Sequence, residues 1–166
     1  MGKQAELKAL LERLYSIYYH IVPEQFKTYC VLNAKLCEFV LSRKGFATKL
    51  IPCQLWYASA QISLIVGFTG SKSDGKWDGH VVCTVGNWLI DPSTSHLQQV
   101  DEKVPIFVLC NRLPNFSAAL GKWALNREST LWWHRPPPGW DTTLPTMPSE
   151  LIEGLGVQLL ERLSYP

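Results

Sequence analysis

The chain has 166 residues, of which 46% are hydrophobic, so length and composition predict one globular domain over residues 1–166. The net charge is +2 and the basic residues are scattered, so neither nucleic acid nor a membrane is an expected partner. The first residues are amphipathic and charged, without the apolar run of a signal peptide, and no stretch is apolar over a bilayer-spanning length. We therefore expect a cytoplasmic protein, with non-classical export left open.

The five cysteines are spread widely along the chain: Cys30, Cys37, Cys53, Cys83 and Cys110. Their number is odd and no CxxC pair is present, so the sequence favours neither a disulfide framework nor a structural zinc site. We expect no metal and no cofactor. All except Cys30 lie in apolar stretches and are predicted to be small core residues.

Two helices are predicted in the N-terminal part. Apolar residues recur at helical spacing over residues 6–20, and Pro23 marks the end of this first helix. A second helix is predicted over residues 28–43, with Thr28 as its N-cap. This start would place Cys30 in the first turn.

From residue 46 onwards the pattern changes to the alternation that is typical of strands. Strands are predicted over residues 47–52, 61–68, 80–85, 88–91 and 104–110. Pro52 would place its strand at an edge or a bulge, because proline lacks the N–H that a central strand donates. The polar residues 70–79 are expected to form a loop and a candidate lid.

The C-terminal part, residues 111–166, is predicted to extend a core of about residues 28–110. A helix is expected over residues 116–127, capped by Asn115, and an irregular proline-rich run over 134–148. A last helix follows Pro148. Helices, then strands, then helices indicate the α+β class.

The segment GHVVCTVGNWLIDPS contains the strongest local signal. Gly86-Asn87 is the signature of a two-residue type II′ turn, which would pair Val82 with Asp91. His80 and Asp91 would then be diagonal neighbours on one face, about 7–8 Å apart at Cα and within reach of a hydrogen bond. Asp91 could fix the tautomer of His80 and stabilise its cation.

Other interpretations of this pair stay open. A three-residue turn would shift the register by one and place His80 and Asp91 on opposite faces. Both residues could also be structural, at a strand end and at a turn. A metal site formed with Cys83 is disfavoured, because the two-residue register points Cys83 away from His80.

Cys30 is the cysteine that is best placed to be a nucleophile. At a helix start, unpaired N–H groups and the helix dipole stabilise a thiolate. An oxyanion could be bound by the backbone N–H of Cys30, or by the side chains of Gln25, Tyr29 or Trp77. The alternative is that Cys30 is a small core residue. The remaining histidines are expected to be structural or solvated: His20, His96 and His134.

The order of these features matches a known pattern. The matching residues are Cys30, Ala34, Arg43-Lys44-Gly45-Phe46, the strand 47–51, Gly79-His80 and Trp88-Leu89-Ile90-Asp91-Pro92. The pattern resembles the transglutaminase-like superfamily of the papain-like fold, and is similar to the arylamine N-acetyltransferases. The resemblance implies a Cys-His-Asp triad, a helix packed on an antiparallel sheet, and acyl-transfer chemistry.

We therefore expect an α+β protein with a papain-like core that hydrolyses an amide or peptide bond through Cys30, His80 and Asp91. Its substrate would be a peptide, a protein or a small amide. Transfer of the acyl group to an amine is one alternative. Another is an inactive binding module, because the aromatic residues of 131–140 (LWWHRPPPGW), if exposed, could anchor an interface. The sequence gives no oligomeric state.

Overall fold

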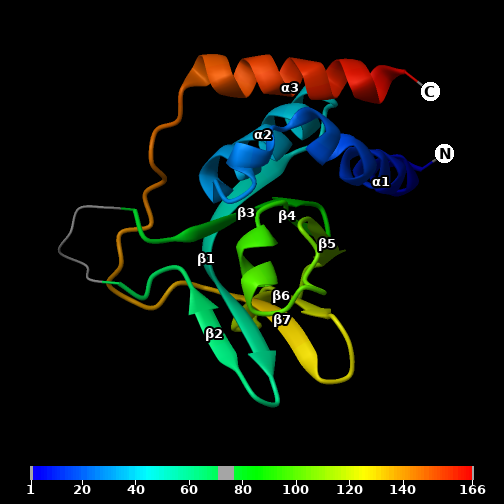
Figure 1. Cartoon of the computed structure of the whole chain (residues 1–166). Helices are drawn as coiled ribbons and strands as arrows, with labels where there is room; N and C mark the ends of the chain where they lie inside the picture. The colour runs from blue at the N-terminus through cyan, green and yellow to red at the C-terminus, as the bar shows by residue number, and fades with distance from the viewer. Residues whose placement is uncertain (1, 71–76, 166) are drawn as a thin grey trace.

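The computed structural model describes residues 2–70 and 77–165. Over these ranges the protein is α+β, as predicted, with three α-helices on one side of an antiparallel sheet, the C-terminal helix being the one farthest from the sheet (Figure 1). The helices are α1 (Lys3–Ile21), α2 (Cys30–Arg43) and α3 (Ser149–Ser164). None of the described helices is long and apolar enough to cross a membrane.

Seven strands form one sheet within the described residues, in the order β5-β4-β3-β1-β7-β6, with β2 pairing beside β1. They are β1 (Thr48–Ser59), β2 (Ser63–Val66), β3 (His80–Val85), β4 (Trp88–Asp91), β5 (Val108–Asn111), β6 (Ala119–Ala124) and β7 (Ser129–His134). A bridge between Arg112 and Gly121 brings β5 next to β6. The sheet therefore almost closes into a barrel.

The long strand β1 connects the two halves of the sheet. Its first half pairs with β3, and its second half pairs with β7 on one side and β2 on the other. Pro52 lies opposite Val81 in the first half, before the pairing with β7 begins at Gln54. The strand that contains Pro52 is therefore central in the sheet and not an edge strand as predicted, but Pro52 itself has a paired strand on one side only, which suits a residue without an N–H.

The helical layer covers one face of β3 and β4 with an apolar core. Apolar residues recur every three or four positions on the buried faces of α1 and α3: Leu7, Leu11, Leu14, Tyr18, Leu155, Leu159 and Leu163. They pack with Cys83, Val85 and Ile90 of the sheet. The helix periodicity of the sequence is confirmed here, because one stripe of each helix is buried.

The N-cap prediction for α2 is wrong. The helix begins at Cys30 with Tyr29 as its N-cap, and no side chain caps it. Thr28 contributes its backbone carbonyl instead, which accepts a hydrogen bond from the N–H of Cys30 over 3.0 Å.

A second apolar core fills the inside of the curved sheet. Its largest fully buried side chain is that of Trp133, which lies between β6 and β1 in the sheet order. The other buried members are Cys53, Leu55, Tyr57, Val82, Leu89, Leu97, Val104, Val108, Cys110, Leu120 and Leu131. The hairpin of β3 and β4 therefore separates two cores and contributes side chains to both.

The predicted helix over residues 116–127 is wrong, and β6 and β7 form a hairpin there. Asn115 precedes this hairpin and caps no helix. The side chain of Asn126 accepts hydrogen bonds from the backbone N–H groups of Glu128 and Ser129 and so shapes the turn. Along β7 burial alternates, which is the period of a strand and not of a helix.

Two predicted strands are shorter than expected. The run 61–68 gives β2 only at Ser63–Val66, and the run 104–110 gives β5 at Val108–Asn111. Of the candidate lid over residues 70–79, residues 71–76 lie outside the described residues. The predicted irregular run is confirmed as a chain segment that leads from β7 to α3 (Figure 1, orange), and we call residues 135–148 the strap.

Candidate active site

The hairpin of β3 and β4 has the predicted two-residue turn. Val85 pairs with Trp88 and Cys83 with Ile90, and Gly86 has a φ of 53°. Glycine suits this turn because its first central position needs a positive φ. The register places His80 on the same face as Asp91, as expected.

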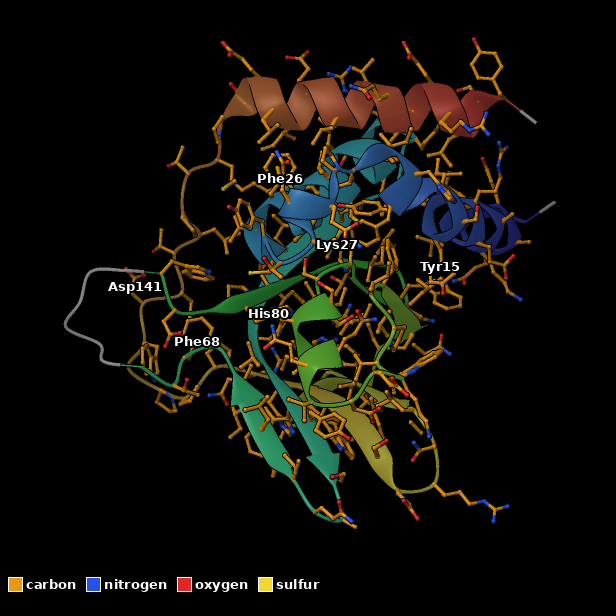
Figure 2. The ribbon with its side chains drawn as sticks, viewed as in Figure 1. Tyr15, Phe26, Lys27, Phe68, His80 and Asp141 are labelled. Atoms are coloured by element: carbon orange, nitrogen blue, oxygen red, sulfur yellow. The ribbon has the colours of Figure 1, made fainter. Side chains whose placement is uncertain are left out.

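His80 lies inside the molecule (Figure 2) and forms a buried pair with Asp91. The Nε2 atom of His80 lies 2.6 Å from Oδ2 of Asp91, and the side chains are 2% and 0% exposed. The bond therefore confirms the contact predicted from the hairpin register.

The carboxylate of Asp91 has two further donors. The indole Nε1 of Trp133 donates to Oδ2 over 2.7 Å, and the backbone N–H of Ser93 donates to Oδ1 over 3.0 Å. Burial alone would raise the pKa of Asp91. His80 and these hydrogen bonds outweigh burial and hold that pKa below its usual range.

The charge of His80 depends on the same contacts. Burial favours a neutral ring, but the Asp91 carboxylate, with a smaller contribution from Cys30, raises the pKa of His80 to about 10. His80 is thus held as a cation against an anionic Asp91 at neutral pH. Because Nε2 faces Asp91, Nδ1 is the ring nitrogen left for another partner.

Cys30 lies at the start of α2, beside the residue that precedes His80. Its Sγ donates a hydrogen bond to the carbonyl oxygen of Gly79, 3.8 Å away, and the side chain is half-buried. Cys30 is also near enough to His80 to contribute to its raised pKa. The structure therefore brings Cys30, His80 and Asp91 together, from α2, β3 and β4.

The other cysteines have a different environment. Each is buried in an apolar core, and burial raises the pKa of each thiol, to about 12 in Cys83 and Cys110. They therefore stay protonated at neutral pH. Cys83 packs under the helices, on the face away from Asp91, so the hairpin does not supply a shared metal site.

The predicted oxyanion donors differ in their exposure to solvent and in whether they already have a hydrogen-bond partner. The backbone N–H of Cys30 already bonds to Thr28, which corrects the expectation that it is free for an oxyanion. Gln25 is exposed on the short helix η1 (Glu24–Phe26), and Tyr29 is 52% exposed. The buried Nε1 of Trp77 finds no hydrogen-bond acceptor among the described residues.

Glycines allow the backbone to approach closely in front of His80. A Cβ on Gly79 would lie 2.7 Å from the ring of Phe68 and would also collide with Trp77. A Cβ on Gly67, whose φ is 92°, would lie 2.7 Å from the backbone nitrogen of His80. Both positions exclude larger residues, which explains the Gly-His pair in structural terms.

A buried polar network that the sequence reasoning missed supports the site. The side chain of Asn33, one turn after Cys30, donates to the carbonyls of Phe26 (2.7 Å) and Tyr29 (3.1 Å) and to Oγ of Ser93 (3.1 Å). It thus ties the segment before Cys30 to the segment after Asp91. In the sequence, the one signal for this role is a polar residue among apolar helix positions. The structure shows that the side chain of Asn33 is fully buried, and buried polar groups are normally hydrogen-bonded.

Two further side chains lie near the His80–Asp91 pair, those of His96 and Trp133. His96 lies half-buried on η2 (Ser95–Gln99), its ring centroid 6.2 Å from that of His80, and its Nε2 has no partner among the described residues. The exposed-aromatic argument for residues 131–140 is wrong, because Trp133 is fully buried against Asp91 and Trp132 is half-buried.

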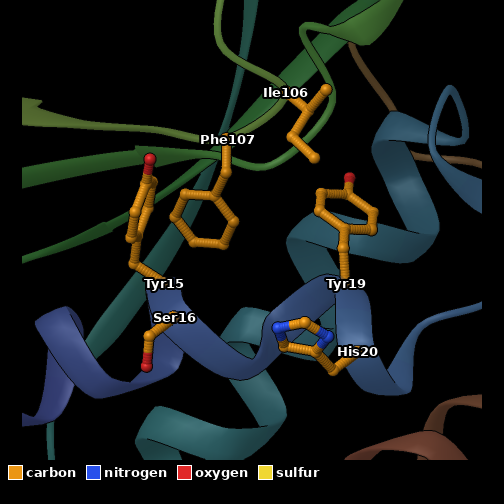
Figure 3. A pocket seen from close by; sticks show the side chains of 6 residues that line it. All are labelled: Tyr15, Ser16, Tyr19, His20, Ile106 and Phe107. Atoms are coloured by element: carbon orange, nitrogen blue, oxygen red, sulfur yellow. The ribbon is translucent and has the colours of Figure 1, made fainter.

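A separate pocket of about 250 Å³ lies between α1 and the segment that precedes β5 (Figure 3). The hydroxyl of Tyr19, one of its lining residues, donates to the Pro92 carbonyl. It is lined by Tyr15, Ser16, Tyr19, His20, Ile106 and Phe107. These side chains include no thiol and no carboxylate, so the candidate active site is the one at Cys30.

Comparison of the chain with family models, curated proteins and solved structures gave no match. The transglutaminase-like resemblance and the papain-like core therefore stay predictions.

Proposed function

We propose that the protein is a thiol-dependent acyl-transfer enzyme that hydrolyses an amide or peptide bond. The observation that carries this proposal is the buried His80–Asp91 pair with the half-exposed Cys30 beside it. A nucleophile next to a base that a third group orients is the arrangement that acyl transfer requires. Its substrate would be a peptide, a protein or a small amide.

The reaction has two halves. The Cys30 thiolate attacks the carbonyl carbon, and the oxyanion that forms collapses as the C–N bond breaks. His80 gives its proton to the leaving amine, which leaves a thioester on Cys30. His80 then takes a proton from water, the resulting hydroxide attacks the thioester, and the acid departs as the thiolate and imidazolium are restored.

Trp77 is the residue we propose for the oxyanion. Its indole N–H is buried without an acceptor among the described residues, and its ring packs in the same cluster as Cys30. Loss of one oxyanion donor typically costs about 10²–10³ in kcat. Trp77→Phe should therefore lower kcat strongly and leave alkylation of Cys30 unchanged, because alkylation forms no oxyanion.

All five cysteines are free thiols, which fits a reducing compartment such as the cytoplasm.

Transfer to an amine uses the same residues, since an amine can replace water in the second half of the reaction. Incubation of an acylated Cys30 with increasing amine separates hydrolase from transferase. A hydrolase releases mainly acid, whereas a transferase yields mainly the new amide.

Alkylation by iodoacetamide, followed by peptide mapping, tests the proposal. At pH 7 we expect Cys30 to react at least about tenfold faster than in His80→Gln, because His80 stabilises the thiolate. His134→Gln, in a half-buried histidine on β7, is the matched control and should react as wild type. If His80→Gln leaves the rate at Cys30 unchanged, Cys30 is not an activated nucleophile.

A further inference from the structure

Cys30 is surrounded by apolar side chains from separate parts of the chain. It packs on a small buried cluster of Val31, Ala34 and Val81. The half-buried neighbours of this cluster are Leu50, Trp77, Leu144 and Met147. Leu144 and Met147 belong to the strap, so a segment more than a hundred residues away in sequence packs on the same cluster as Cys30, and we call these half-buried neighbours the wall.

The strap is held in place at several points. The ring of Phe68 contacts Trp77 and Trp140 edge to face, with centroid distances of 5.5 and 5.7 Å. Beyond Met147 the chain enters α3, which packs against α1 and α2. Leu144 lies between these anchors, so its position relative to Cys30 is fixed by packing on both sides.

Two carboxylates near this wall in sequence, those of Asp78 and Asp141, already accept backbone hydrogen bonds. Oδ2 of Asp78 accepts the backbone N–H groups of Thr69 (3.0 Å) and Gly70 (2.6 Å). Oδ1 of Asp141 accepts the N–H of Thr143 over 2.9 Å. Among the described residues, the side chains that pack on this cluster with Cys30 are apolar. A charged substrate group there would lose water without gaining a partner.

We propose that Trp77, Leu144 and Met147 form the subsite for the acyl side chain, and that it takes an uncharged aromatic or large aliphatic group. This inference rests on the proposed function. Leu144 and Met147 keep part of their apolar surface exposed, so a bound group can still be desolvated against them. Each CH₂ buried there should raise the acylation rate about fourfold.

A panel of p-nitrophenyl esters tests the inference in single-turnover experiments. The Cys30 thiolate forms a thioester, and the C–O bond breaks to release p-nitrophenolate, which absorbs. The probes are acetyl, 3-phenylpropionyl, glutaryl and 6-aminohexanoyl esters, with Cys30→Ala as the background. We expect the phenylpropionyl ester to acylate Cys30 at least about tenfold faster than the acetyl ester, and the two charged esters to react no faster than acetyl.

Substitutions in the strap assign the preference to Leu144. Leu144→Ala should reduce the phenylpropionyl-to-acetyl ratio about tenfold, and Leu144→Glu should raise the rate with the 6-aminohexanoyl ester above that with glutaryl. Leu160→Ala, in a half-buried leucine of α3, is the control and should keep the wild-type ratio. Met147→Ala should act in the same direction as Leu144→Ala and replaces it if that variant does not fold.

The outcomes separate the two proposals. If no ester and no iodoacetamide reacts at Cys30, the proposed function itself fails. If Cys30 acylates but the ratio is the same in wild type and in both strap variants, the subsite is wrong and the enzyme stands. If the strap variants instead speed up both acetylation and alkylation, the strap covers the thiol and is no subsite.

Discussion

The indole nitrogen of Trp133 donates a hydrogen bond to Oδ2 of Asp91 over 2.7 Å, although 42 residues separate them in the sequence. Both side chains are fully buried. The second core of the protein, inside the curved sheet, thus supplies a donor to the carboxylate that faces His80. This hydrogen bond therefore connects the core inside the sheet with the candidate active site.

Trp133→Phe should destabilise the protein. It removes the donor to a buried carboxylate and leaves a small cavity, so the free energy of unfolding should fall by about 2–4 kcal/mol in urea titration. Trp132→Phe is the matched control. Trp132 is half-buried, and Nζ of Lys122 lies over it, 4.6 Å from the ring centroid. Replacing its indole should therefore lower the free energy of unfolding by less than about 1 kcal/mol. Equal effects would contradict the structural role of the Trp133–Asp91 bond.

The pair of His80 and Asp91 should make stability depend on pH. Because the pKa of His80 is raised in the folded protein, its contribution is complete below the unfolded value near 6.5 and disappears as pH rises towards 10. Between pH 6.5 and 8.5 the free energy of unfolding should fall by up to about 1.4 kcal/mol per pH unit.

Asp91→Asn is the comparison for this pH dependence. Without the carboxylate, burial is the largest influence on His80 and outweighs the smaller contribution of Cys30, so the folded ring stays neutral and this decrease disappears. The difference between the two proteins is the quantity to measure, by urea unfolding at several pH values, because the other histidines titrate in both. Equal slopes would show that His80 is not charged in the folded protein.

Asn33→Ala should weaken both the fold and the reactivity of Cys30. It removes the three hydrogen bonds of the amide nitrogen, to the carbonyls of Phe26 and Tyr29 and to Oγ of Ser93, although each carbonyl keeps one backbone donor, and this loss should cost about 3 kcal/mol. The backbone before Cys30 is then held less firmly, so alkylation of Cys30 should slow.

Tyr18→Phe is the control for Asn33. It removes the hydroxyl that donates to Oδ1 of Asn33 over 2.8 Å but keeps the bonds of the amide nitrogen. We expect a loss of about 1–2 kcal/mol with an unchanged alkylation rate at Cys30. If Asn33→Ala unfolds as easily as Tyr18→Phe and alkylates at the wild-type rate, Asn33 does not position the nucleophile.

Two glycines of α3 should respond to alanine in opposite directions. A Cβ on Gly154 meets nothing within 4 Å, so Gly154→Ala should raise the free energy of unfolding by about 0.5–1 kcal/mol through better helix propensity. A Cβ on Gly156 would collide with the ring of Phe39 in α2. Gly156→Ala should therefore lower it by about 1–3 kcal/mol, measured by urea unfolding.

Sequence patterns predicted correctly those elements whose structure depends mainly on residues close together in the sequence. The turn at Gly86 fixed the register of β3 and β4, and this alone placed His80 against Asp91. Helical spacing identified α1 and α3, because each buries one stripe of its surface. The start of α2 placed Cys30 in a first turn, although the cap of that turn is Tyr29 rather than Thr28.

Long-range contacts decided what the sequence could not predict. Residues 116–127 carry enough helix formers to suggest a helix, but pairing of β7 with β1 makes this segment a hairpin. Trp133 looked like an exposed ring because nothing in its neighbourhood indicated that β7 lies beside β1. Asn33 and Leu144 have roles only through partners elsewhere in the chain, so no spacing rule could identify them.

The position of α3 has a consequence for the order of events during synthesis. The helices α1 and α2 leave the ribosome first, but α3 covers them and is made after the whole sheet (Figure 1). The apolar surface of α1 and α2 that packs on α3, rather than on the sheet, therefore stays open to chaperones until the last of the three helices emerges. The strap that carries Leu144 onto the cluster beneath Cys30 is held at its C-terminal end by α3, so a nascent chain that stalls before residue 149 would have a thiol whose surroundings lack this anchor.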